Sequence, residues 1–221
     1  KNWRTASRES AGIAPDPAAT HEAVLHVYGA DAWGWRGWFA VHTWIAAKRA
    51  DADHYKVYQV IGWNLRRGRS TVTVSRTQAP DFTWYNAPPE LLLERRGAGV
   101  DRLIDQVEAA VADYPYPDRY SVWPGPNSNT FTAYVARQVP ELGLDLPPTA
   151  IGKDYLPDGK LVDAMPSGSG WQVSLLGLFG IGLAWEEGIE LNVLGLAAGV
   201  DVNDLALRLP GLGRFEFVPA G

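Results

Sequence analysis

The chain of 221 residues contains no cysteine, and 20 Lys and Arg against 25 Asp and Glu give it a net charge of −5. The absence of cysteine excludes disulfides, cysteine-ligated zinc, iron–sulfur clusters and a cysteine nucleophile. The basic residues are scattered, so we expect no broad surface for nucleic acid. No glycine-rich segment ends in Lys followed by Ser or Thr, so nucleotide binding has no support.

Long hydrophobic runs are also scarce. The longest stretch without a charged residue is 164–185, whose 22 residues would nominally cross a bilayer. It contains five glycines and three serines, and two glutamates follow it directly. A pair of buried strands, or a surface that rests on lipid, therefore fits this stretch better than a membrane-spanning helix.

Tryptophan, proline and glycine are abundant, with 10, 16 and 23 residues. This composition indicates a loop-rich protein that works at an interface. The tryptophans at 33–38 either belong to the hydrophobic core and its edge or form a surface that meets lipid headgroups. The second interpretation implies a peripheral membrane contact. Residues 1–20 are polar and contain proline, so we expect an extended linker there and a single α+β domain over 21–221.

Periodicity predicts strands first and helices afterwards. Strands are expected over 22–28, 37–47, 55–63 and 69–76, with the last two forming a hairpin. Helices are expected over 88–96, 99–113 and 128–139. The remaining part, 141–221, is rich in Gly and Pro, and we expect it to be irregular apart from strands at 172–185 and 188–196.

His42 is the first candidate for a functional residue. It lies in the second expected strand between Trp38 and Trp44, in a segment that is otherwise almost wholly apolar. An imidazole there is either hydrogen-bonded for structural reasons or held as a general base. Its position alone leaves both roles open.

Ser128 is the second candidate, at the start of an expected helix after a proline-rich turn. The helix dipole offers a hydroxyl there about 0.3–1 kcal/mol, less than the roughly 1.4 kcal/mol of one pKa unit. The dipole alone therefore cannot activate serine, and a base must lie nearby. In the alternative, Asn127 or Ser128 only caps the helix.

His42 on an early strand and the later sequence Asn127-Ser128-Asn129-Thr130-Phe131 at a helix start resemble circularly permuted papain-like hydrolases. These are the relatives of NlpC-type peptidases and of lecithin:retinol acyltransferase, which have cysteine where this chain has Ser128. The resemblance implies a permuted papain-like core, an antiparallel sheet with packed helices, followed by the irregular C-terminal part. The change to serine implies either a serine enzyme or a scaffold that has lost catalysis.

The same resemblance implies a role for each site residue. Ser128 would be the nucleophile, His42 would be the base, and His54 or Gln59 would orient the imidazole. Backbone N–H groups near Asn129 would hold an oxyanion, with support from the neighbouring Asn127.

Two functions are compatible with this site. One is an envelope-associated hydrolase or acyltransferase that uses the Ser–His pair. The other is a non-catalytic bacterial envelope protein that binds a lipid or a peptidoglycan fragment in the same groove. A His42 side chain within hydrogen-bonding reach of Ser128 favours the first function, and a separated pair favours the second.

Longer motifs are similar to a bacterial domain family of unknown function. The similarity covers about residues 4–214, and its motifs lie at 41–46, 123–131, 147–155, 187–196 and 209–214. The family brings no known activity. Its members carry an N-terminal membrane segment ahead of this region, which implies a bacterial envelope protein anchored through a segment outside this sequence.

The other polar candidates have structural explanations. His21 and His26 are expected at the surface or as hydrogen-bonded core residues, and Lys153 and Asp154 as a structural ion pair. A group of acidic residues lacks the spacing of a calcium loop, so we predict a solvated edge, no metal and no cofactor. This group consists of Glu186, Glu187, Glu190, Asp201 and Asp204.

Overall fold

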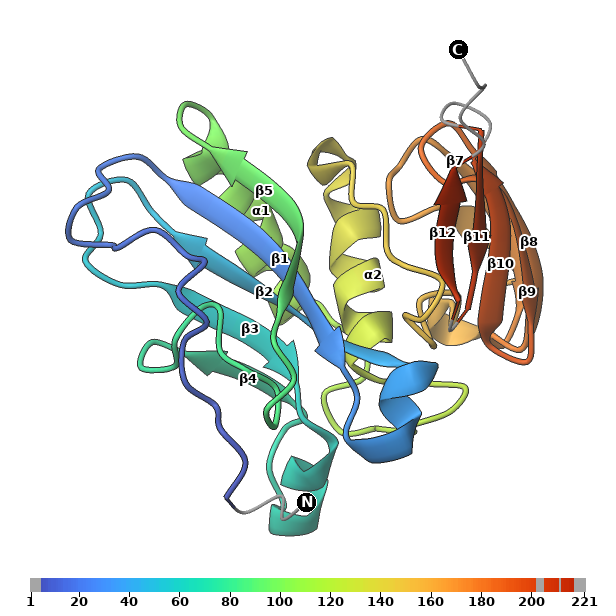
Figure 1. Cartoon of the computed structure of the whole chain (residues 1–221), viewed down its shortest axis with the longest axis horizontal. Coiled ribbons are helices and arrows are strands. Elements are labelled where there is room, and N and C mark those ends of the chain that lie inside the picture. The colour runs from blue at the N-terminus through green and yellow to red at the C-terminus, as the bar shows by residue number, and fades with distance from the viewer. Residues whose placement is uncertain (1–4, 202–204, 211, 217–221) are drawn as a thin grey trace.

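The protein is described by a computed structural model that covers residues 5–201, 205–210 and 212–216. In these residues the fold consists of two antiparallel sheets and two α-helices, with helix α2 between the sheets (Figure 1). This mixed architecture confirms the predicted α+β class. Within the described part of the chain, no helix has the length and hydrophobicity needed to cross a bilayer.

The N-terminal sheet has five strands in the order β4-β3-β2-β1-β5. Their bounds are β1 (Val24–Asp31), β2 (Val41–Lys48), β3 (Lys56–Val60), β4 (Val72–Ser75) and β5 (Glu90–Arg96). The central strands β1 and β2 pair along their whole length, from Val24 opposite Lys48 to Asp31 opposite Val41. Seven of the eight residues of each are buried, which is expected of strands covered on both faces.

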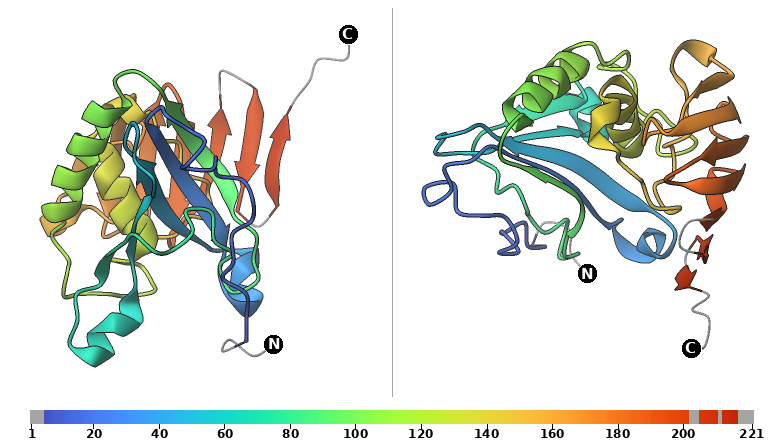
Figure 2. Two further views of the ribbon diagram at one scale, coloured as in Figure 1. Left: turned by 90° about the vertical axis from the view of Figure 1, so that its left-hand side faces the viewer. Right: turned by 90° about the horizontal axis from the view of Figure 1, so that it is seen from above.

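Each face of this sheet packs against a different part of the chain (Figure 2). Leu25, Val27 and Ile45 face helices α1 (Val100–Ala112) and α2 (Ser128–Gln138). The alternate residues, among them Trp44, form a second cluster with Phe82. Successive side chains of a strand point to opposite faces, so β1 and β2 contribute to both clusters.

The described part of the predicted linker, residues 5–20, is attached to this second face. Asp81 accepts hydrogen bonds from Ser10 Oγ at 2.7 Å, from the backbone N–H of Ile13 at 2.6 Å and from that of Ala14 at 3.0 Å. Residues 10 and 82 also form a β-bridge.

The strands and helices predicted up to residue 139 are confirmed, with three differences. The strand predicted over 55–63 ends at Val60, because the 3-10 helix η2 (Gly62–Arg67) follows it. The segment 88–96, predicted as a helix, is strand β5, because pairing with β1 outweighs the helix propensity of its Leu, Glu and Arg residues. The second strand begins at Val41 because the residues before it form the 3-10 helix η1 (Gly34–Trp38). Two further 3-10 helices are η3 (Pro140–Leu142) and η4 (Pro157–Gly159).

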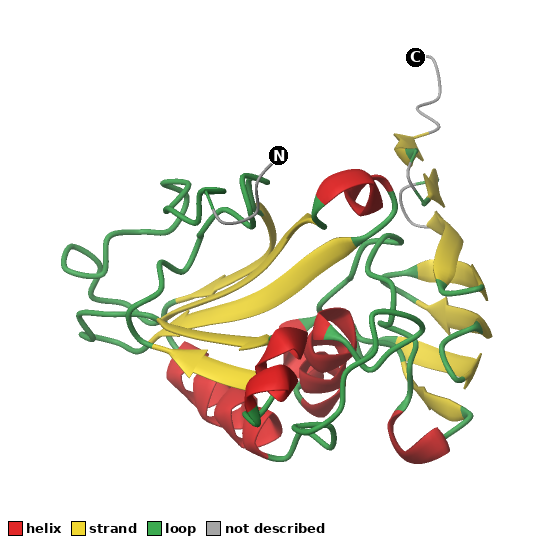
Figure 3. Ribbon diagram, turned by 90° about the horizontal axis from the view of Figure 1, so that it is seen from below, coloured by secondary structure: helices red, strands yellow, loops and turns green. Residues whose placement is uncertain are grey.

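The C-terminal part is a sheet, so the prediction that it is irregular apart from two strands was wrong (Figure 3). Its seven strands are arranged as a meander in which each strand pairs with the next. They are β6 (Val162–Ala164), β7 (Gly170–Leu175), β8 (Phe179–Ala184), β9 (Gly188–Val193), β10 (Leu196–Asp201), β11 (Ala206–Leu209) and β12 (Gly213–Glu216). The strand predicted over 172–185 is the pair β7 and β8, and the strand predicted over 188–196 is β9.

The C-terminal sheet has its polar face inside. Gln172, Glu190 and Asn192 point toward the rest of the protein and are at most 5% exposed. Two ion pairs attach this face to the preceding loop: a buried one between Lys153 and Glu190 and a half-buried one between Arg208 and Asp145. Lys153 thus pairs with Glu190, rather than with Asp154 as predicted.

The acidic group is therefore largely internal. Glu187, Glu190 and Asp201 are at most 3% exposed, so the prediction of a solvated edge was wrong for them. Glu187 binds Ser167, Glu190 binds Lys153, and Asp201 accepts from Arg208. Glu186 is exposed, and Asp204 lies outside the described residues.

Candidate functional site

A cavity of about 290 Å³ lies where strand β2 begins and helix α2 begins; we call it the site cavity. It brings together His42, Ser128, Asn127 and Asn129, four of the residues predicted from the sequence. Its remaining wall is mainly aromatic and apolar, formed by Trp35, Phe39, Val41, Trp84, Tyr120, Val122, Trp123 and Ile151 among others.

The ring of His42 is fixed by a hydrogen bond and a stack. Its Nε2 lies 3.1 Å from Gln59 Oε1, and Gln59 Nε2 donates to Gln78 Oε1 at 2.9 Å. Since the amide nitrogen of Gln59 is directed to Gln78, its oxygen accepts from His42 Nε2–H, which leaves Nδ1 unprotonated. The ring stacks on Trp84, with 3.7 Å between centroids and 11° between planes.

Burial lowers the pKa of His42 to about 4, and the hydrogen bond to Gln59 offsets only part of that shift. The side chain is 7% exposed, and the charged imidazolium would lose most of its hydration. His42 is therefore neutral at pH 7.

This shift predicts a pH-dependent stability. Between pH 6.5 and 4 the unfolded chain binds a proton at His42 that the folded chain does not bind, so stability falls as the pH falls. From pH 7.5 to 4.5, His42 should account for a loss of about 2–3 kcal/mol. Urea unfolding at both pH values measures this decrease in the free energy of unfolding. The decrease should be smaller by this amount in His42→Phe than in the wild type. Equal decreases in the two proteins would contradict the low pKa of His42.

Asn127, not Ser128, caps helix α2. Asn127 Oδ1 accepts from the backbone N–H groups of Asn129 at 2.9 Å and Thr130 at 3.1 Å, and the Thr130 hydroxyl accepts from the N–H of Asn127. Ser128 occupies the first helical position. Its hydroxyl has no hydrogen-bond partner among the residues that the structure describes, so capping does not explain this serine.

The two neighbours should therefore differ in their effect on stability. Asn127→Ala removes the cap and also the hydrogen bonds from Asn127 Nδ2 to the carbonyls of Val122 and Ile151, so we expect a loss of about 2 kcal/mol. Ser128→Ala removes no hydrogen bond and should change the free energy of unfolding by less than about 0.5 kcal/mol. Equal losses in urea unfolding would show that Ser128 shares the capping role.

Asn129 joins the helix to the strand that carries His42. Its Nδ2 donates to the carbonyls of Val41 and Ile151, and its Oδ1 accepts from Thr43 Oγ1 at 2.9 Å. Because the backbone N–H of Asn129 is used by the cap, it does not provide the predicted oxyanion donor. The N–H of Ser128 has no acceptor among the described residues and is the group available for that role.

His42 and Ser128 line one cavity but do not form a pair. Thr43 Oγ1 donates to Asn129 and Thr132 on helix α2, so Thr43 faces the helix. By the alternation of a strand, His42 points to the opposite face, where it stacks on Trp84. No hydrogen bond joins the two side chains in the described structure. His42 and Ser128 are therefore the separated pair that favours a binding protein over a hydrolase.

Of the two residues expected to orient His42, only Gln59 reaches it. His54 lies in the loop between β2 and β3, where its Nδ1 is 2.7 Å from Asp53 Oδ1. It lines a different cavity, with Arg49, Lys56 and Glu108 among its walls. The twelve-residue spacing from His42 therefore does not bring His54 to the site.

The other two histidines have structural contacts, as predicted, and lie outside the site cavity. His26 is fully buried, with its ring nitrogens 2.7 Å from Tyr28 Oη and 2.7 Å from a Glu94 oxygen. His21 is exposed and lies 3.1 Å from Asp51.

The sequence analysis missed two residues that hold the His42 ring in place. Trp84 stacks on His42, and Gln78 fixes the amide of Gln59. The adjacent aromatic residues Trp84 and Tyr85 in a proline-containing loop were a usable signal for an aromatic wall. Gln78 carried no signal, since only the fold places it beside β3.

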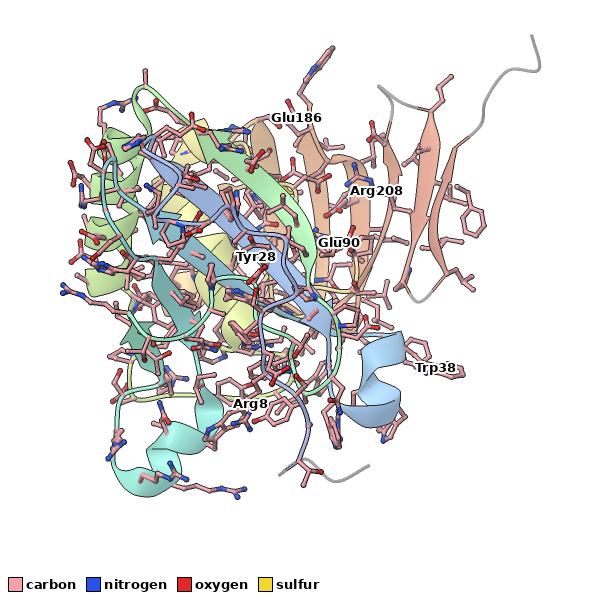
Figure 4. The ribbon with its side chains drawn as sticks, turned by 60° about the vertical axis from the view of Figure 1, so that its left-hand side comes forward. Arg8, Tyr28, Trp38, Glu90, Glu186 and Arg208 are labelled. Carbon is pink, nitrogen blue, oxygen red and sulfur yellow. The ribbon has the colours of Figure 1, made fainter. Side chains whose placement is uncertain are left out.

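A second, open groove of about 530 Å³ adjoins the site cavity and shares Ala32, Trp35 and Trp84 with it. Trp35 and Trp38 are 71% and 75% exposed, so neither belongs to the core. Figure 4 shows Trp38 projecting from η1 away from the body of the protein. Contact of this cluster with lipid stays a prediction.

The fold and the site define an α+β protein with a buried histidine, a helix-start serine and aromatic walls around one cavity, and the described residues contain no cluster suited to a metal ion. Residues 22–155 match the sequence model of one protein family, whose description is protein of unknown function (DUF3750). The chain belongs to this family, which confirms the predicted family resemblance over that range. No match was found among the curated proteins or the solved structures, and nothing in these comparisons supports the papain-like resemblance.

Proposed function

We propose that the site cavity binds a small molecule derived from the bacterial envelope, a lipid or a peptidoglycan fragment, without changing it chemically. The observation that carries this proposal is the composition of the cavity. Aromatic rings form its walls, while the Ser128 hydroxyl and the unprotonated His42 Nδ1 lack protein partners among the described residues. A mostly apolar pocket with a few oriented polar groups is typical of ligand sites.

The separated arrangement of His42 and Ser128 favours binding over chemistry. A general base works best with a pKa near the working pH, whereas the pKa of His42 is about 4. A neutral imidazole and a hydroxyl can still accept and donate hydrogen bonds to a ligand. The adjoining groove of about 530 Å³ offers room for the rest of a molecule larger than the cavity.

Calorimetric titration of the protein with muramyl dipeptide and with a short-chain phosphatidylglycerol tests this proposal. We expect one of the two to bind, and Trp84→Ala to weaken that binding at least tenfold, since an aromatic wall is lost. Trp171→Ala, on the C-terminal sheet, is the matched control and should bind as the wild type does. Binding of neither probe, or equal binding by both variants, would contradict the proposal.

The second candidate is a serine hydrolase or acyltransferase on a permuted papain-like core. Support comes from the Ser128 hydroxyl, which the cap does not use, and from its place in one cavity with His42 and Gln59 nearby. The His42 ring would first have to leave its stack on Trp84. Ser128 Oγ would then attack an acyl carbon as His42 Nδ1 takes its proton, the Ser128 N–H would hold the oxyanion, and His42 would protonate the leaving group.

A fluorophosphonate probe separates the two candidates. If Ser128 is a nucleophile, the wild type is labelled, and Ser128→Ala and His42→Phe are not. Unlabelled wild type, without esterase or amidase turnover, would exclude the hydrolase.

The exposed aromatic residues of η1 and Phe39, which follows it, also support a peripheral membrane contact. We propose that the protein is anchored in the envelope by a segment outside this sequence. Trp35, Trp38 and Phe39 are 71%, 75% and 44% exposed. Aromatic side chains of this kind favour the lipid headgroup region. Vesicle co-sedimentation should be reduced in Trp35→Ser/Trp38→Ser, and unchanged co-sedimentation would contradict this contact.

A further inference from the structure

One face of the C-terminal sheet is turned away from helix α2 (Figure 1). The side chains on this outer face are apolar. Twelve side chains of this face are each between 44% and 68% exposed. They are Val162, Trp171, Val173, Leu175, Phe179, Ile181, Leu183, Ile189, Leu191, Val193, Val200 and Phe215. We refer to these twelve residues as the outer face.

Strand pairing brings these side chains into continuous rows. Trp171 lies opposite Leu183, which lies opposite Ile189, and Ile189 lies opposite Val200. A second row joins Val173, Ile181 and Leu191. Cross-strand neighbours on one face are about 5 Å apart, so the rows merge into one surface without a charged residue.

The usual arrangement of a half-covered sheet is reversed here. An antiparallel sheet with one solvated face normally directs apolar side chains to the core and polar ones to water. In this sheet the inner face holds Gln172, Glu190 and Asn192, all at most 5% exposed, while the outer face is apolar. This distribution is that of a sheet whose outer face is also covered in the working protein.

We propose that the outer face is covered by the outer face of a second copy of this chain, forming a homodimer. Twelve half-exposed side chains of this size present on the order of 1,000 Å², whereas a stable interface needs about 800 Å² from each partner and the largest patch of a monomer is about 300–600 Å². Two such sheets stack about 10 Å apart with interdigitating side chains, as in a β-sandwich. The face is self-complementary because it contains no charge that a copy of itself would repel.

The charges around the face favour a second copy over an anionic membrane. The charged residues exposed beside β6 to β9 are Asp158, Lys160 and Glu186, and Lys160 lies 3.7 Å from Asp163. Along β6 to β9 the described rim therefore carries more negative than positive charge, and anionic headgroups would repel it. In a dimer the same charges lie at the solvated edge of the interface, where salt screens them.

Sedimentation velocity between 1 and 100 µM tests the dimer. The wild type should sediment with twice the 24.2 kDa mass of the chain. Leu183→Glu/Leu191→Glu places charge in the centre of the face and should weaken the dimer at least about a hundredfold. Val74→Glu is the matched control, because Val74 is a 55% exposed strand residue on the other sheet, and this variant should remain dimeric.

A second measurement does not depend on the glutamate variants being folded. The chain has no cysteine, so single substitutions Leu183→Cys, Leu191→Cys and Val193→Cys can be oxidised without background. At least one should give a disulfide-linked dimer, while Val74→Cys should not. Monomeric wild type at 100 µM without cross-links would overturn the proposal. Monomeric wild type that binds phosphatidylcholine vesicles through the outer face, and loses this in Leu183→Glu/Leu191→Glu, would overturn it in favour of lipid.

Discussion

Replacing Lys153 with methionine is expected to lower the free energy of unfolding by about 3–5 kcal/mol, because it leaves a buried carboxylate without its partner. Lys153 and Glu190 are 1% and 3% exposed and form an ion pair between the loop before η4 and strand β9. Burial alone would lower the pKa of Lys153, but the charges of Glu190 and Asp154 outweigh it and raise that pKa. The lysine is thus charged at neutral pH.

Urea unfolding of three variants tests this expectation. Lys153→Met/Glu190→Leu removes both charges and should recover most of the loss. Lys160→Met breaks an exposed pair, with Lys160 Nζ 3.7 Å from Asp163, and should cost less than about 1 kcal/mol. If Lys153→Met costs no more than Lys160→Met, the buried pair does not hold the C-terminal sheet to the rest of the protein.

Gly152→Ala is the second substitution with a large expected effect. It should lower the free energy of unfolding by about 3–4 kcal/mol. Gly152 has a φ of +96°, which strains any other residue, and a Cβ there would lie 2.5 Å from Asn127 Nδ2. Asn127 would have to move, and helix α2 would lose its cap. Since Asn127 also lines the site cavity, we expect ligand binding to weaken in the same variant.

Gly159→Ala separates the two causes. Gly159 also has a positive φ, of +70°, but no atom lies within 4 Å of an added Cβ. It should therefore cost only the backbone strain, about 1 kcal/mol. Equal losses for the two alanine variants, compared by urea unfolding, would mean that the contact between residue 152 and Asn127 does not limit stability.

The N-terminal half of the fold could be predicted because its local signals agree with its tertiary structure. By the period of two, a strand over 37–47 places Thr43 and Ile45 on one face and His42 and Trp44 on the other. The structure has the same division. Strand β5 was missed because its Leu, Glu and Arg residues favour a helix, and only pairing with β1 makes it a strand.

The C-terminal sheet escaped prediction for two physical reasons. Its two-residue turn between β9 and β10 consists of Leu194 and Gly195, with φ values of 56° and 83°, where Asn-Gly or Asp-Gly would be the usual signal. Its polar residues point inward, so Glu190 and its neighbours were interpreted as a solvated edge. The sequence pattern gives the alternation but not which face is covered.

The candidate site was predictable in its residues but not in its geometry. The resemblance pointed to His42, Ser128, Gln59, His54, Asn127 and Asn129. All of them except His54, which lines a different cavity, lie at or beside the site cavity. Their mutual orientation depends on which face of β2 meets helix α2. The sequence contains no local signal for that choice.

The indole N–H signals of the tryptophans test the central claim, ligand binding in the site cavity, most directly. In a ¹⁵N-resolved NMR titration with muramyl dipeptide or short-chain phosphatidylglycerol, the signals of Trp35, Trp84 and Trp123 should shift, because these residues line the cavity. Those of Trp171 and Trp185, which belong to the C-terminal sheet and its β8–β9 turn, should not. Shifts at Trp171 and Trp185 alone, or at no tryptophan with either ligand, would contradict the account.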